Sequence, residues 1–191
     1  MKLVLASKSP RRKELLSLCS KEFDVRVSDA DESYDPSLDP KDIARIIATK
    51  KAMATELLQD DEIIIGCDTI VVSPSGEIMG KPRDKSDAVR MLKALSGTAH
   101  RVISGLCVHS KDKVFATSIT TTVYMRTLCD EEIEYYVSTY NPIDKAGAYG
   151  IQEMAGSFVE KIDGDFFNVV GLPLCDLSKI LKEEFDFPIT Y

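Results

Sequence analysis

Two adjacent arginines at the start of a predicted helix are the first residues whose position suggests chemistry. In SKSPRR, Ser9 is a suitable N-cap and Pro10 a suitable first helical residue, so Arg11 and Arg12 occupy the second and third positions. The helix dipole disfavours each cation there by about 0.3 to 1 kcal/mol. A bound anion would reverse this preference, because free backbone NH groups and two guanidinium groups would converge on it. The alternative is two solvated surface arginines.

An aspartate interrupts a strongly apolar run. Asp68 lies in IIIGCDTIVV, where an ionised carboxylate would cost much free energy if it were fully buried and unpaired. We therefore expect Asp68 where the strand opens onto a cleft. At such a place it can hold a divalent cation or accept a proton from water, and both tasks suit hydrolysis of a phosphate ester. The alternative is a structural aspartate that caps the following turn.

Three further charged residues are candidates for the same chemistry. Lys81 lies in GKPRD, where glycine permits close backbone approach and proline fixes the loop, so it is a candidate point charge for a phosphate. Lys51 lies on the flank of a helical apolar stripe, and Glu32 lies in the acidic segment SDADES. The alternatives are a solvated turn for Lys81, a lysine stem covering apolar surface for Lys51, and a solvated loop residue for Glu32. Together with the arginines and Asp68, these groups favour a phosphate-bearing substrate and a cation.

The elements that must position these side chains follow from the apolar pattern. The first half of the chain predicts a strand at 3–6, a helix from 10 to about 19 or 20, and a strand at 23–27. It then predicts an irregular acidic loop at 28–39, a helix from 40 to about 58, and a central strand at 63–72 buried on both faces. The apolar stripe of the second helix is Ile43, Ile47, Ala54 and Leu58.

The second half predicts a turn at 73–76, a helix capped by Asp84 and stopped by Gly97, and a hairpin of 101–109 with 114–125. A short helix capped by Asp130 follows to about Tyr140, and a last hairpin joins 158–162 with 167–170. Gly171-Leu172-Pro173 opens a terminal helix. The sequence has no internal repeat and no linker between independent domains, so we expect one domain over residues 1–191.

The composition is that of a folded globular protein and limits its partners. Of 191 residues, 44% are hydrophobic and 29% are charged, and the net charge is -7. That charge opposes the broad basic surface needed to bind extended nucleic acid. The start MKLVLAS has too few apolar residues for a signal peptide or a membrane span, which predicts a cytoplasmic protein without a membrane partner. The five scattered cysteines lack CxxC spacing, so we expect reduced core or strand residues.

Six segments, in this order along the chain, resemble the Maf family: ASKSPRRKELL, GCDTIVV, GKPRD, LSG, DKAGAYGIQ and VVGLPL. The match extends from Leu5 to Leu174. The resemblance implies an α/β fold similar to inosine triphosphate pyrophosphatases, with a mixed, strongly twisted central sheet flanked by helices and two lobes around a cleft. It also implies hydrolysis of nucleoside triphosphates to monophosphate and pyrophosphate. Proteins of this family are historically named septum formation inhibitors, which suggests a link to cell division arrest.

The resemblance also implies roles for individual residues. Asp68 would be the proton acceptor for the water that attacks the α-phosphorus, and Arg12, Lys51 and Lys81 would supply fixed positive charge. Glu32 and Asp68 would hold a divalent cation, Mg²⁺ or Mn²⁺. The expected partners are a nucleoside triphosphate and a second copy of the chain in a homodimer.

The choice of base is implied by three positions. The branch of the family that resembles dTTP/UTP pyrophosphatases has Arg, Thr and Gln where the branch acting on 7-methyl-GTP has Trp, Gln and Glu. This sequence has Arg11, Thr69 and Gln152. The resemblance therefore implies dTTP and UTP as substrates, with modified pyrimidine nucleotides as a further class.

Two other functions fit parts of the pattern. A regulator of cell division would bind a nucleotide without turnover, and the complete polar set, Asp68 included, argues against it. A nucleotidyltransferase would release pyrophosphate only when a second substrate is present.

Overall fold

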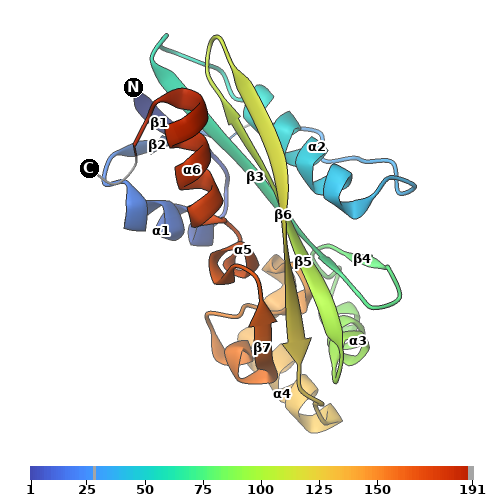
Figure 1. Ribbon diagram of the computed structural model, residues 1–191. Coiled ribbons are helices and arrows are strands. Elements are labelled where there is room, and N and C mark those ends of the chain that lie inside the picture. Colours follow the sequence, from blue (N-terminus) through green and yellow to red (C-terminus); the bar gives the residue numbers. More distant parts are fainter. Residues whose placement is uncertain (28, 189–191) are drawn as a thin grey trace. The chain divides into compact units, whose positions relative to one another are not determined.

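The computed structural model describes residues 1–27 and 29–188 and has a mixed α/β architecture (Figure 1). The strands are β1 (Lys2–Ala6), β2 (Phe23–Val25), β3 (Glu62–Val72), β4 (Ile78–Met79), β5 (Ala99–His109), β6 (Val114–Met125) and β7 (Val159–Asp163). The α-helices are α1 (Pro10–Cys19), α2 (Pro40–Met53), α3 (Lys85–Leu95), α4 (Asp130–Tyr140), α5 (Phe166–Val170) and α6 (Leu174–Phe185). Short 3₁₀ helices are η1 (Pro142–Asp144), η2 (Ala146–Ala148) and η3 (Met154–Phe158).

Among the described residues the strands form a mixed sheet in the order β2-β1-β3-β5-β6-β7, and β4 pairs with β3. Strand β1 runs parallel to β2 and to β3, with Leu3 opposite Phe23 on one side and Ile63 on the other. Strand β4 is antiparallel to β3, and β7 is antiparallel to β6. The expected mixed sheet flanked by helices is therefore confirmed.

Residue contacts divide the chain into two compact units. Unit 1 consists of the described residues of 1–68, 104–119 and 171–191, and unit 2 consists of 69–103 and 120–170. The division falls between Asp68 and Thr69 on β3. The expectation of a single domain over residues 1–191 stays a prediction.

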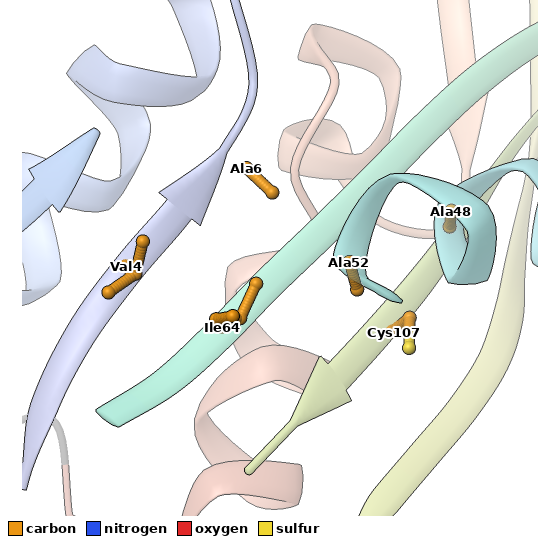
Figure 2. Packing of buried hydrophobic residues seen from close by; sticks show 6 residues of the cluster. All are labelled: Val4, Ala6, Ala48, Ala52, Ile64 and Cys107. Carbon is orange, nitrogen blue, oxygen red and sulfur yellow. The ribbon is translucent and has the colours of Figure 1, made fainter. Parts of the chain in front are cut away.

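One hydrophobic cluster in the core of unit 1 lies between α2 and the strands β1, β3 and β5. In Figure 1, α2 lies on one side of β3, and α1 and α6 lie on the other. Figure 2 shows this cluster, which consists of Val4, Ala6, Ala48, Ala52, Ile64 and Cys107. Two glycines permit the close approach: a Cβ at Gly66 would lie 2.4 Å from the Ala48 carbonyl oxygen, and one at Gly105 would lie 1.9 Å from that of Ala44. The helix backbone thus lies directly on β3 and β5, which no larger residue at these positions would allow.

Unit 2 has its own core and helix caps. The rings of Tyr136 on α4 and Phe158 on η3 pack edge to face, with centroids 5.3 Å apart. The Asp84 side chain accepts a hydrogen bond from the Asp87 NH at 2.8 Å, which caps α3 as predicted. Gly97, with φ at 67°, follows the helix end as expected.

Most elements appear where the sequence predicts them, with small differences at their ends. Strand β2 ends at Val25 and not at Val27. The predicted loop 28–39 has no helix or strand over 29–39, while Ser28 lies outside the described residues. The N-cap of α4 is Cys129 and not Asp130, because the Glu132 carboxylate folds back to accept the Cys129 NH at 3.1 Å.

Helix α2 ends at Met53, five residues before the predicted end at Leu58. The Thr55 hydroxyl donates to the Lys51 carbonyl at 3.0 Å, and the Thr55 NH turns back to the Ala52 carbonyl. The Leu58 NH donates to the buried Glu62 carboxylate at 2.8 Å. The expected stripe positions Ala54 and Leu58 are therefore exposed, because these backbone groups find partners outside a continued helix.

Residues 166–170 form the helix α5, so the predicted strand at 167–170 is wrong. The Asp165 carboxylate accepts the Phe167 NH at 2.8 Å, which starts a helical turn. The side-chain amide of buried Asn168 donates to the Val102 carbonyl at 3.2 Å and to the Thr121 hydroxyl at 2.9 Å. These contacts hold residues 166–170 in a helix, although their short apolar run predicts a strand.

The cysteines are free, as predicted, but the expected place in the core or in a strand is confirmed for Cys67 and Cys107 and is wrong for Cys19, Cys129 and Cys175. Cys67 and Cys107 are buried, whereas Cys129 and Cys175 are exposed. Within residues 1–27 and 29–188, no helix is long and apolar enough to cross a membrane.

Candidate active site

Asp68 lies where the burial of β3 is interrupted. The strand is buried from Glu62 to Cys67 and again from Ile70 to Val72, while Asp68 and Thr69 are partly exposed. The Asp68 side chain is 14% exposed, and its Oδ1 accepts a hydrogen bond from the Lys51 Nζ at 2.6 Å. The carboxylate is thus neither fully buried nor unpaired, while its expected place at a cleft stays a prediction.

Lys51 lies between two carboxylates from different parts of unit 1. Besides Asp68, its Nζ contacts the Glu32 Oε1 at 3.1 Å. Lys51 occupies the last turn of α2, where the negative end of the helix dipole favours a cation. Its side chain is 15% exposed, so it is an ion-paired lysine and not one that only covers apolar surface. We call Glu32, Lys51 and Asp68 the lysine–carboxylate cluster.

The position of α2 places Lys51 at Asp68. The next residue, Ala52, lies against Gly66, where an added Cβ would be 2.8 Å from the Ala52 Cβ. Gly66 precedes Asp68 by two residues on β3. The close approach of α2 to this glycine therefore sets the distance between the ammonium group and the carboxylate.

The arginines begin α1 as predicted. The Ser9 hydroxyl accepts from the Arg12 NH at 3.4 Å, and the first turn contains no acidic residue. Arg12 is not simply solvated, because its Nε donates to the Gly171 carbonyl at 2.8 Å and its Nη1 to the Ser7 hydroxyl at 3.3 Å. Arg11 is partly buried. A role of both arginines in anion binding stays a prediction.

The Gly171 carbonyl is a contact that the sequence did not reveal. It accepts from Arg12 and also from the Cys67 thiol at 3.4 Å. Gly171 has φ at 129°, a conformation that favours glycine. The start of α1, the residue before Asp68 and the turn before α6 are thereby joined in unit 1. The motif VVGLPL was the only signal for this in the sequence.

The other candidate residues belong to unit 2. Thr69 follows Asp68 on β3, Lys81 is exposed in the loop after β4, and Gln152 is exposed in a turn before η3. The Gly80 carbonyl next to Lys81 accepts the Gly147 NH at 3.1 Å. The glycine-rich motif DKAGAYGIQ therefore contacts the Lys81 loop within this unit.

A buried polar pair supports the same motif. The His100 Nε2 lies 2.7 Å from the Tyr149 hydroxyl, and the rings pack edge to face. Burial lowers the pKa of His100 from 6.5 to about 4 and raises the pKa of Tyr149, so both groups are neutral at pH 7. No local sequence pattern predicts this pair, because its two residues are 49 positions apart.

The donor atoms of the cluster fit a hard divalent cation. Mg²⁺ is commonly held by one or two carboxylates together with water and substrate phosphates. Glu32 and Asp68 supply two carboxylates that already converge on one cationic nitrogen. In the described part of the chain, no group of three or more His, Cys, Asp or Glu side chains forms a metal-binding cluster. Glu32 and Asp68 would supply two ligands to such a cation.

Fold and site together define a mixed α/β protein with a lysine–carboxylate cluster at an interruption in a buried strand. The model of the family described as Maf-like protein matches residues 2–184, and the chain belongs to this family.

Known proteins from several organisms are similar to this chain. A dTTP/UTP pyrophosphatase of Geobacter metallireducens is 50% identical over 183 residues, covering 95% of each chain. A dTTP/UTP pyrophosphatase of Bacillus cereus is 43% identical over 190 residues, covering 100% of this chain and 98% of the relative. The solved structure of a HAM1 protein from Coxiella burnetii has a TM-score of 0.50 at 13% identity, over 96% of this chain and 99% of that chain. At that identity the likeness concerns the fold alone.

Proposed function

We propose that this chain hydrolyses dTTP and UTP to the nucleoside monophosphate and pyrophosphate. The observation that carries the proposal is the 2.6 Å contact between Asp68 and Lys51 at the interruption in β3. It supplies a positioned carboxylate beside a fixed cation, as attack of water on a phosphate anhydride requires. The relatives named dTTP/UTP pyrophosphatase, at 43% to 50% identity, support the same reaction.

In the proposed reaction Asp68 accepts a proton from a water molecule. The water oxygen forms a bond to the α-phosphorus, and the bond from this phosphorus to the bridging α–β oxygen breaks. The leaving group is pyrophosphate. Lys51 holds the carboxylate in place, and Arg12, Lys51 and Lys81 offset the negative charge of the triphosphate.

A divalent cation, Mg²⁺ or Mn²⁺, held by Glu32 and Asp68 would neutralise charge on the triphosphate and the leaving pyrophosphate when bound. Arg11, Thr69 and Gln152 are assigned to choosing the base. The cytoplasm as location and a homodimer as assembly belong to the same proposal, and the homodimer rests on the family resemblance.

A nucleotide panel in water labelled with ¹⁸O tests the reaction. With Mg²⁺ or Mn²⁺, dTTP and UTP should yield pyrophosphate, and the label should enter the nucleoside monophosphate. Release of inorganic phosphate with a nucleoside diphosphate would indicate a different triphosphatase. Nucleotide binding without turnover would instead indicate a regulator.

A further inference from the structure

A tight turn in unit 2 presents Gln152. The Glu153 NH donates to the Gly150 carbonyl at 3.1 Å, which closes a four-residue turn. Ile151 within it is buried, while Gln152 is exposed. The position of the Gln152 side chain therefore depends on what holds the two ends of this turn.

Both ends of the turn contact Lys145. The Lys145 Nζ lies 3.4 Å from the Glu153 Oε2 and 2.8 Å from the Asp144 Oδ1. Its stem lies against the other end, because a Cβ at Gly150 would be 2.9 Å from the Lys145 Cε. The side chain is 9% exposed, less than the 15% of Lys51. A lysine buried to this degree needs its carboxylate partners, so its contacts constrain the turn.

The segment Lys145–Glu153 also contacts the loop of Lys81 and the strand of Thr69, the other two candidate residues in unit 2. Gly147 donates its NH to the Gly80 carbonyl beside Lys81. Gly147 has φ at 66°, and a Cβ there would lie 2.9 Å from a methyl group of Val71, two residues beyond Thr69 on β3. One segment thus contacts the loop of Lys81, the strand of Thr69 and the turn of Gln152.

From these contacts we infer that Lys145 is a positioning residue for base selection. It holds the Gly150–Glu153 turn in place and thereby fixes the position of Gln152. This rests on the proposed function, in which Gln152 contacts the base. Lys145 itself acts through the turn, because its ammonium group is ion-paired with Asp144 and Glu153.

The test compares two variants. Lys145→Met keeps an apolar stem and removes the charge. Glu153→Gln removes the same ion pair by changing its more exposed partner. Each variant should lower the ratio of kcat/KM for UTP to that for GTP by about tenfold, mainly through a higher KM for UTP. The control is Lys93→Met, which removes a lysine of the same unit from its exposed pair with Asp130. It should leave the ratio unchanged. Equal losses for UTP and GTP in both variants would overturn the inference.

A double-mutant cycle and hydrogen exchange separate positioning from general stability. In a Gln152→Ala background, Lys145→Met should not change the UTP to GTP ratio further, whereas independent effects would contradict the inference.

The Glu153 amide should exchange faster in Lys145→Met and Glu153→Gln than in the wild type, but not in Lys93→Met. Unchanged exchange would show that Lys145 does not hold the turn. Because exchange needs no turnover, it decides this point even if the wild type hydrolyses no triphosphate and the proposed function is wrong.

Discussion

The position of the Asp68 carboxylate is fixed by the charged residues around it. A carboxylate inside an apolar strand is costly unless it is paired, and here Lys51 pairs with it at 2.6 Å. The same lysine contacts Glu32 at 3.1 Å, so two carboxylates share one cation. At the scale of single residues, this arrangement fixes the position of the Asp68 carboxylate, as the proposed proton transfer from water requires.

Replacement of Asp68 by asparagine should leave the fold intact and lower kcat by about 100-fold to 10,000-fold, because the amide cannot accept the proton. Steady-state kinetics with UTP at saturating Mg²⁺ would measure the loss, and circular dichroism would check the fold. Asp61→Asn is the matched control, since Asp61 is 59% exposed just before the same strand. A kcat of Asp68→Asn near that of the control would contradict the assigned role.

Glu62 at the start of β3 should govern part of the acid stability. Its side chain is 1% exposed and accepts from both terminal nitrogens of Arg26 and from the Leu58 NH. These hydrogen bonds lower the pKa of Glu62 from 4.5 to about 2, and those from Arg26 have the largest effect. A lowered pKa in the folded state means that the stabilisation is complete above pH 4.5 and is lost as the pH falls toward 2.

The variant Glu62→Gln should therefore lower the free energy of unfolding at pH 7 by about 3 kcal/mol, because the Arg26 guanidinium loses its carboxylate partner. Denaturant unfolding at pH 7 and pH 3 would show it. The gap between wild type and variant should shrink at pH 3, because the wild type loses the contribution of the carboxylate. An equal gap at both pH values would refute the linkage.

At the scale of elements, the contact between α2 and the sheet decides whether the site forms. The helix backbone approaches β3 and β5 so closely that only glycine fits at positions 66 and 105. The last turn of this helix carries Lys51, and β3 carries Asp68. Packing and site geometry are therefore coupled through one helix–strand contact.

Gly66→Ala should move α2 away from β3, because the new Cβ would lie 2.4 Å from a backbone oxygen that cannot rotate aside. We expect a loss of about 3 kcal/mol, or a Tm lower by about 6 to 12 °C, with lower kcat in the fraction that stays folded. Differential scanning calorimetry would measure the shift. Gly80→Ala is the control for stability, since nothing lies within 4 Å of a Cβ there. Equal Tm values for the two variants would argue against the close contact.

At the scale of the whole molecule, the residues assigned to base choice are distributed over both units, with Arg11 in unit 1 and Thr69 and Gln152 in unit 2. The triple change Arg11→Trp, Thr69→Gln, Gln152→Glu should shift preference from UTP toward 7-methyl-GTP. The indole can stack on the cationic base, and the carboxylate can pair with it. The ratio of kcat/KM for the two nucleotides measures the shift. An unchanged ratio in the folded triple variant would show that these positions do not select the base.

The sequence by itself determined the elements whose signals are local. Ser9-Pro10 and Asp84 start helices as predicted, because a cap acts on the NH groups of the next turn. The run 63–72 forms a buried strand, and the cost of burying a charge placed Asp68 at its partly exposed point. The family resemblance then supplied roles that no spacing could supply.

Only the three-dimensional structure decided the features that depend on which particular groups come into contact. Helix α2 ends at Met53, and 166–170 is helical, because backbone and side-chain groups there find partners that the local apolar pattern does not reveal. The contact of Lys51 with both Glu32 and Asp68, and that of Lys145 with both ends of its turn, likewise arise from close packing. A sequence pattern specifies which face of an element is buried, but the atoms that meet there are set by how closely two backbones approach.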